Sequence, residues 1–138
     1  MPKGSCICGA VKVEFTGEPM GKVLCHCEPC KKYAGANGST NLALKTDQYH
    51  QIGDAPLRHY TRKGASGADV TYDFCAVCPT VMTVRTAAMN DVVFFKLGLL
   101  DSLEEMERIT PNTEIFVKYR IAPWCERGSH VELKEGSG

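Results

Sequence analysis

The chain has 138 residues, and its 16 basic and 16 acidic side chains give a formal net charge of zero. This length favours a single domain, and the balanced charge gives no overall attraction to nucleic acid or to anionic lipid. No apolar run approaches the ~20 residues that a membrane span requires, so we expect a soluble protein whose partner is neither a nucleic acid nor a membrane.

Short strand-like runs, separated by glycine and proline, make up most of the sequence. Apolar and polar side chains alternate in some of these runs, and others are almost wholly apolar. We expect strands at residues 10–15, 70–74, 81–86, 92–97 and 114–119. Many short strands with turn signals between them predict a mainly β fold.

Two short helices are also expected. Glu28 and Pro29 suit the first turn of a helix, and Gly35 suits its end. Ser102 and Glu105 have the spacing of a capping box, which predicts a second helix limited to about two turns by the proline that follows.

Seven of the eight cysteines fall into three tight clusters. These are the pair Cys6 and Cys8, the trio Cys25, Cys27 and Cys30, and the pair Cys75 and Cys78. If the strands beside the two pairs are neighbours, four thiolates converge on a closed tetrahedral zinc site, which is typical of structural zinc. The trio alone leaves one coordination position open for water or a substrate, which is typical of reactive zinc. The sequence therefore predicts two zinc ions per chain, one structural and one catalytic.

Disulfide bonds are the alternative use of eight cysteines. Two features argue against them. No apolar segment typical of a secretion signal follows Met1, and cysteines one residue apart are badly placed to bond each other. Thiolates kept as metal ligands imply a reducing compartment, so we expect a cytoplasmic protein.

The cysteine trio lies where the first helix is expected to begin. The amide groups and the dipole at a helix amino terminus stabilise thiolates. Because a zinc with three thiolates is a weak Lewis acid, we expect it to hold an incoming thiolate rather than to generate hydroxide. His26 or Cys125 could instead close the site from within the chain. A residue between two ligands usually points away, however, and a lone cysteine beside Trp124 is more often a buried apolar residue.

Several segments of the chain resemble the glutathione-dependent formaldehyde-activating enzyme family. They are residues 4–11, 25–32, 35–36, 74–78 and 111–124, so the likeness extends over nearly the whole chain. The resemblance implies a zinc-containing β-tent (β-sandwich-like) fold of short antiparallel strands, as one domain over residues 1–138. We expect residues 134–138 to be a flexible tail.

The same resemblance implies carbon–sulfur lyase chemistry, with the formation of S-hydroxymethylglutathione from glutathione and formaldehyde as the reference reaction. Its structural zinc maps to Cys6, Cys8, Cys75 and Cys78, and its catalytic zinc maps to Cys25, Cys27 and Cys30.

Two features depart from the family pattern. Pro79 stands where glycine is usual, which removes an amide that could bond a cysteine sulfur. The segment after Trp124 also differs, so the substrate can differ from that of the reference reaction.

Two functional hypotheses follow. The first is a zinc-dependent carbon–sulfur lyase acting on an adduct of glutathione or a related thiol. Its proton-transfer group would be one of His26, Lys31, Tyr33, His50 and His59. The alternative is a zinc-stabilised protein-binding module of the same fold without catalysis.

Overall fold

The computed structural model describes residues 1–121 and 132–134. Within these residues the chain forms eleven strands, two α-helices and three short 3-10 helices. The strands are β1 (Lys3–Ser5), β2 (Lys12–Phe15), β3 (Gly21–Cys25), β4 (Ser39–Lys45), β5 (Tyr49–Ile52), β6 (Leu57–Lys63), β7 (Asp69–Cys75), β8 (Val81–Thr86), β9 (Val92–Lys96), β10 (Thr113–Ile115) and β11 (Glu132–Leu133). The α-helices are α1 (Glu28–Ala34) and α2 (Leu103–Arg108), and the 3-10 helices are Thr46–Gln48, Leu97–Leu99 and Val117–Tyr119.

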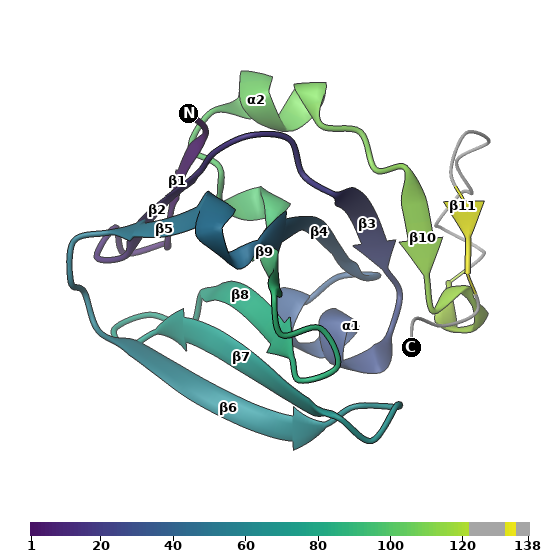
Figure 1. The fold of residues 1–138 in the computed structure, drawn as a ribbon. Coiled ribbons are helices and arrows are strands. Elements are labelled where there is room, and N and C mark those ends of the chain that lie inside the picture. The colour runs from purple at the N-terminus through teal and green to yellow at the C-terminus, as the bar shows by residue number, and fades with distance from the viewer. Residues whose placement is uncertain (122–131, 135–138) are drawn as a thin grey trace.

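The strands form two sheets. A three-stranded sheet has the order β1-β2-β5, and an eight-stranded sheet has the order β11-β10-β3-β4-β9-β8-β7-β6. Figure 1 shows the larger sheet curving from β10 through β3 and β4 to β7 and β6, with α1 in view between β3 and β7. The Tyr33 ring of α1 packs edge-on against Tyr72 of β7, with 5.4 Å between the ring centroids. The prediction of a mainly β fold with two short helices is confirmed.

The hydrophobic core joins the two sheets. Phe95 of β9 is fully buried, and its ring contacts Phe15 of β2 at a centroid distance of 5.4 Å and Tyr49 of β5 at 6.2 Å. Leu42 and Met82, also fully buried, belong to the same cluster. Burying such side chains stabilises the fold by about 1.5–3 kcal/mol each, so this cluster fixes how the sheets pack.

The strand expected at residues 114–119 is wrong beyond Ile115. Phe116 has a φ of 54°, and the 3-10 turn follows it. A left-handed backbone at a bulky residue is uncommon and ends the strand there. β10 also runs parallel to β3, whereas the remaining pairs, apart from β10 with β11, are antiparallel.

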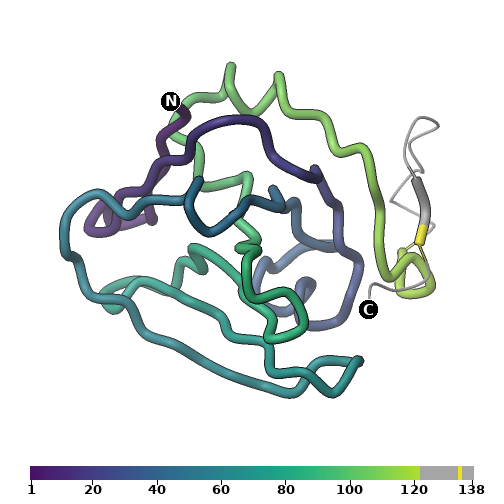
Figure 2. Tube along the Cα trace, viewed as in Figure 1, coloured from purple at the N-terminus to yellow at the C-terminus, as the bar shows by residue number. Residues whose placement is uncertain are grey.

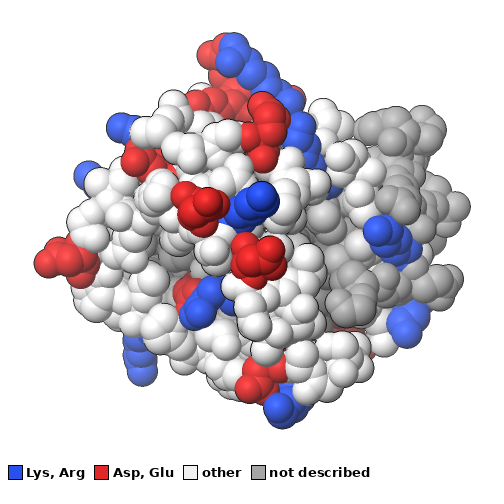
Figure 3. Space-filling view, viewed as in Figure 1, with Lys and Arg blue, Asp and Glu red and all other residues white. Residues whose placement is uncertain are grey.

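The molecule carries mixed charge on its surface. On the face in Figure 3, acidic and basic side chains are interspersed over much of the surface, as the balanced composition leads one to expect. Among the described residues, no helix combines the length and the apolar character needed to cross a membrane.

The amino-terminal strand packs closely against the segment after β9. Figure 2 shows the start of the chain running beside this later segment, and Gly4 forms an isolated antiparallel bridge with Leu100. A Cβ atom at Gly4 would lie 2.5 Å from the carbonyl oxygen of Leu99, so only glycine fits at this position.

We expect Gly4→Ala to lower the free energy of unfolding by about 1–3 kcal/mol, because the added methyl group must push two backbone segments apart. Gly98→Ala is the matched control, since a Cβ there meets no atom within 4 Å. Urea unfolding of the metal-loaded proteins compares the two variants. Equal stability of both would contradict the close approach at Gly4.

Candidate metal centres

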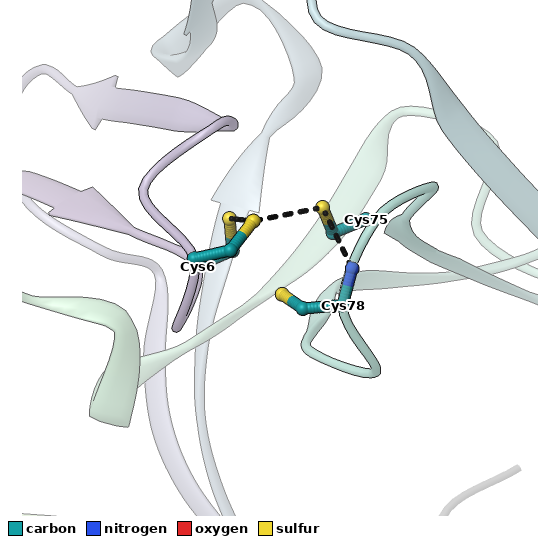
Figure 4. Close-up of side chains that lie close together, drawn as sticks. Cys6, Cys75 and Cys78 are labelled. Atoms are coloured by element: carbon teal, nitrogen blue, oxygen red, sulfur yellow. Dashed lines mark hydrogen bonds between the residues drawn. The ribbon is translucent and has the colours of Figure 1, made fainter.

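The two cysteine pairs meet in one cluster. Cys6 and Cys8 lie in the loop between β1 and β2, Cys75 ends β7, and Cys78 lies in the turn before β8. The four sulfur atoms all lie within 4.8 Å of one another, and Figure 4 shows three of these cysteines side by side. Sulfurs about 2.3 Å from a tetrahedral zinc are about 3.8 Å apart, so this donor set fits the metal.

Hydrogen bonds from the backbone prepare these sulfurs to carry negative charge. The amides of Val77 and Cys78 donate to Cys75 Sγ at 3.3 and 3.4 Å, and the amide of Val11 donates to Cys6 Sγ at 3.3 Å. Such donors favour the thiolate over the thiol.

Pro79 leaves the cluster intact. The hydroxyl of Thr80 lies 3.2 Å from Cys78 Sγ, and this contact, together with the backbone amides of Cys8 and Thr80, lowers the pKa of the Cys78 thiol to about 5. The same hydroxyl accepts a hydrogen bond from the amide of Ile7 at 3.1 Å, so it links the two cysteine loops. Thr80 thus provides a donor on the side of the turn where proline has none.

The cysteine trio gathers where β3 meets α1. Cys25 ends β3, Cys27 is the residue that caps α1, and Cys30 lies in the first turn of that helix. Cys27 Sγ accepts a hydrogen bond from the amide of Cys30 at 3.4 Å, so the cysteine itself serves as the helix cap. The three sulfurs lie within 4.8 Å of one another, and the prediction that Cys27 and Cys30 lie at a helix amino terminus is confirmed.

The ionisation of each of these three thiols depends on that of the other two. Hydrogen bonds from Cys25 and Cys27 lower the pKa of Cys30 to about 2, whereas the contacts with Cys27 and Cys30 raise the pKa of Cys25. All three can be thiolates together only when a cation compensates their charge, which is the chemistry of a metal-binding set.

His26 turns away from the trio. It is fully buried, and its Nε2 atom lies 2.8 Å from Glu114 Oε1 of β10. The group of donor atoms found here contains three sulfurs and no nitrogen of His26. Cys125, the other residue considered for closing the site, lies outside the described residues.

The trio opens into a pocket of about 690 Å³, whereas the four-cysteine cluster contributes no residue to the lining described. Apolar side chains from several strands form much of its wall, including Val23, Phe94 and Ile115. The described lining contains basic residues but no aspartate or glutamate. An anionic or neutral ligand with an apolar part suits such a surface better than a cation.

A polar network lies beside Cys30 in this pocket. The Tyr33 hydroxyl is 3.4 Å from Cys30 Sγ and 2.9 Å from Ser39 Oγ. The Lys96 ammonium donates to the Tyr33 hydroxyl and to Asn41 Oδ1. Burial raises the pKa of Tyr33, and it lowers that of Lys96 to about 8.

Of the five residues predicted as proton-transfer groups, Tyr33 is the one in the described pocket lining. Lys31 instead donates to the carbonyl oxygens of His26 and Tyr119, and His59 pairs with Asp73 at 2.5 Å. His50 is exposed on β5. Lys96, which also lines the pocket, was not predicted from the sequence. The feature that could have revealed it is a charged residue at the end of an apolar, largely buried strand.

Comparison with known proteins identifies the relatives of this chain. The sequence model of the glutathione-dependent formaldehyde-activating enzyme family matches residues 1–119. A crystal structure of a Rhodobacter sphaeroides protein superposes with a TM-score of 0.60 at 18% sequence identity, covering 79% of this chain and 96% of that one. A comparison with curated protein sequences found no match.

The fold and the two thiol clusters define a mainly β protein able to hold metal ions at two separate sites. With the match over residues 1–119, the chain belongs to the glutathione-dependent formaldehyde-activating enzyme family. The predicted family membership is confirmed.

We expect two zinc ions per chain in protein purified under reducing conditions, and one in each of Cys27→Ser and Cys75→Ser. Each substitution removes one thiolate from a different cluster. Ile7→Ser is the control, because this side chain lies between two ligands but is 83% exposed and should leave the count at two. Elemental analysis gives the ratio, and loss of both ions from Cys27→Ser would contradict two independent sites.

Proposed function

We propose that this protein is a zinc-dependent carbon–sulfur lyase that forms or cleaves an adduct of a thiol with an aldehyde. The thiol is glutathione or a related compound, and S-hydroxymethylglutathione is the reference adduct. The family to which the chain belongs supports this proposal, since its name couples glutathione to formaldehyde activation.

The two clusters have different roles in this proposal. Cys6, Cys8, Cys75 and Cys78 hold a structural zinc, whose four thiolates leave no position for a ligand. Cys25, Cys27 and Cys30 hold the catalytic zinc, which supplies an open coordination position for the sulfur of the substrate. Residues 1–138 act as one domain, and the free thiols suit the reducing conditions of the cytoplasm.

The observation that carries the proposal is the position of the trio. All three of its cysteines line the pocket of about 690 Å³, and none of the four cysteines of the other cluster is in the described lining. A structural site needs no access to a pocket, whereas a site that binds a substrate sulfur does.

The residues around the trio have chemistry suited to this reaction. The pocket wall presents apolar side chains, which lower the local dielectric and so strengthen hydrogen bonds and charge interactions beside them. Tyr33, kept in its hydroxyl form by burial, places a donor and acceptor 3.4 Å from a sulfur of the trio. It is therefore our candidate for holding the proton that leaves or joins the substrate.

We expect Cys27→Ser to reduce turnover of S-hydroxymethylglutathione to the spontaneous background while the protein stays folded. Cys75→Ser should instead lower thermal stability, since it disrupts the structural site. Activity is followed as the release of formaldehyde, with the uncatalysed reaction subtracted, and other thiol–aldehyde adducts are screened in parallel.

Chelation gives an independent check of the same proposal. One zinc should resist a chelator, and the other should be lost readily unless glutathione is present. Two equally tight ions indifferent to glutathione, together with no turnover of any adduct, would instead indicate a non-catalytic binding module.

A further inference from the structure

Lys96 is a buried cation at the end of β9 without a carboxylate partner. Its exposed fraction is 9%, and no salt bridge to it is found within residues 1–121 and 132–134. Its hydrogen-bond partners there are the Tyr33 hydroxyl and Asn41 Oδ1, both neutral. Burying an ammonium without a counter-charge costs free energy of folding, so the buried position of Lys96 points to a functional role.

The cysteine trio lies across the Tyr33 hydroxyl from Lys96. Burial lowers the lysine pKa, but negative charge on Cys30, Cys25 and Cys27 opposes this effect and favours the ammonium form. Three thiolates with one divalent cation carry a net charge of −1, which one ammonium balances. The described pocket lining offers no acidic residue for this purpose.

Lys96 also lines the pocket into which the cysteine trio opens. Its ammonium is joined to Cys30 Sγ through a single group, the Tyr33 hydroxyl. An ammonium has three donor hydrogens, and two of them serve Tyr33 and Asn41. In a thiol–aldehyde adduct the oxygen is two bonds from the sulfur, so a sulfur held at the trio puts that oxygen near the group of donors formed by Lys96 and Tyr33.

We propose that Lys96 is a catalytic residue that donates a hydrogen bond to the substrate oxygen as that oxygen becomes negatively charged. This inference rests on the proposed function. When the adduct forms, the thiolate sulfur bonds to the carbonyl carbon, the π electron pair of the C=O bond moves to oxygen, and the oxygen takes up, through Tyr33, the proton that the thiol lost on becoming a thiolate. When the adduct is cleaved, the hydroxyl gives its proton back through Tyr33, the C=O bond forms, and the C–S electron pair leaves with sulfur, which takes up that proton on release as a thiol. In both directions the oxygen carries charge in the transition state, and a fixed cation stabilises it.

Asn41 acts as a positioning residue for the lysine, and Tyr33 positions it in addition to its proposed part in proton transfer. Each accepts one of its hydrogen bonds, so the ammonium is held in a fixed direction before the substrate arrives. Donors that are already held in place need not reorganise as charge develops on the substrate. This preorganisation is the source of their effect on the rate.

The test uses the zinc-loaded protein and the variant Lys96→Met, whose apolar side chain is close in length to lysine. We expect kcat to fall about 10²–10³-fold, as for the removal of one oxyanion donor. Lys96→Gln, which keeps a donor, should recover part of the loss. Lys12→Met, at an exposed position of β2, is the control and should retain full activity.

Ligand binding gives a readout that does not depend on turnover. Thioacetate carries an oxygen two bonds from its sulfur, whereas ethanethiol has no oxygen. Titration calorimetry should show thioacetate binding weakened about 10–100-fold in Lys96→Met, the loss of one hydrogen bond to a charged group, with ethanethiol binding unchanged.

The outcomes separate the two proposals. If the wild-type protein turns over an adduct and Lys96→Met does so equally well, the role of Lys96 is wrong and the proposed function stands. Equal weakening of both ligands, or loss of a zinc ion from Lys96→Met, would show that the lysine stabilises the metal cluster rather than the substrate oxygen. No turnover of any adduct by the wild-type protein would overturn the proposed function, and the catalytic role of Lys96 with it.

Discussion

Mutual repulsion between closely spaced thiolates is the constraint on which the rest of the structure depends. Seven sulfurs lie in two groups, and within each group every sulfur is within 4.8 Å of the others. Such groups carry full negative charge only with a cation and with donors around them. The fold meets this requirement with backbone amides at Cys6 and Cys75, a hydroxyl at Cys78, and the amino terminus of α1 at the trio. Much of the local structure at these loops can be understood as charge compensation.

The sequence was a good guide wherever one local pattern determined the outcome. The strand at 81–86 and the helix from Glu28 to the glycine at position 35 were predicted with their correct limits. Proline in the first turn and a left-handed glycine at the end are signals that act within a few residues. The three tight cysteine clusters were predictable for a similar reason, since their members are two or three residues apart. The meeting of the two pairs, 67 residues apart, was instead expected from the need for four ligands and from the family resemblance.

The misses concern contacts between distant parts of the chain. The run at 114–119 has strand-forming side chains, but its pairing with β3 stops at Ile115 because Phe116 leaves the extended conformation. Lys96 looked like an interruption of an apolar strand. The role of Lys96 can be inferred only from its contacts with β4 and α1, which bring Asn41 and Tyr33 to it across 55 and 63 residues of sequence. No window along the chain contains that information.

The four-cysteine cluster also has a consequence for how the molecule reaches its folded form. Its sulfurs join loops that are 67 residues apart in the chain, so the site exists only after the strands between them are in place. Closing a loop of this length costs much conformational entropy, so we expect the cluster to form late in folding. The free energy of metal binding would then add to the stability of a structure that is already assembled. A metal ion bound there would therefore lock the finished fold more than initiate folding. The lifetime of the protein would then depend on metal supply, because a chain without the ion lacks a link between loops that are 67 residues apart.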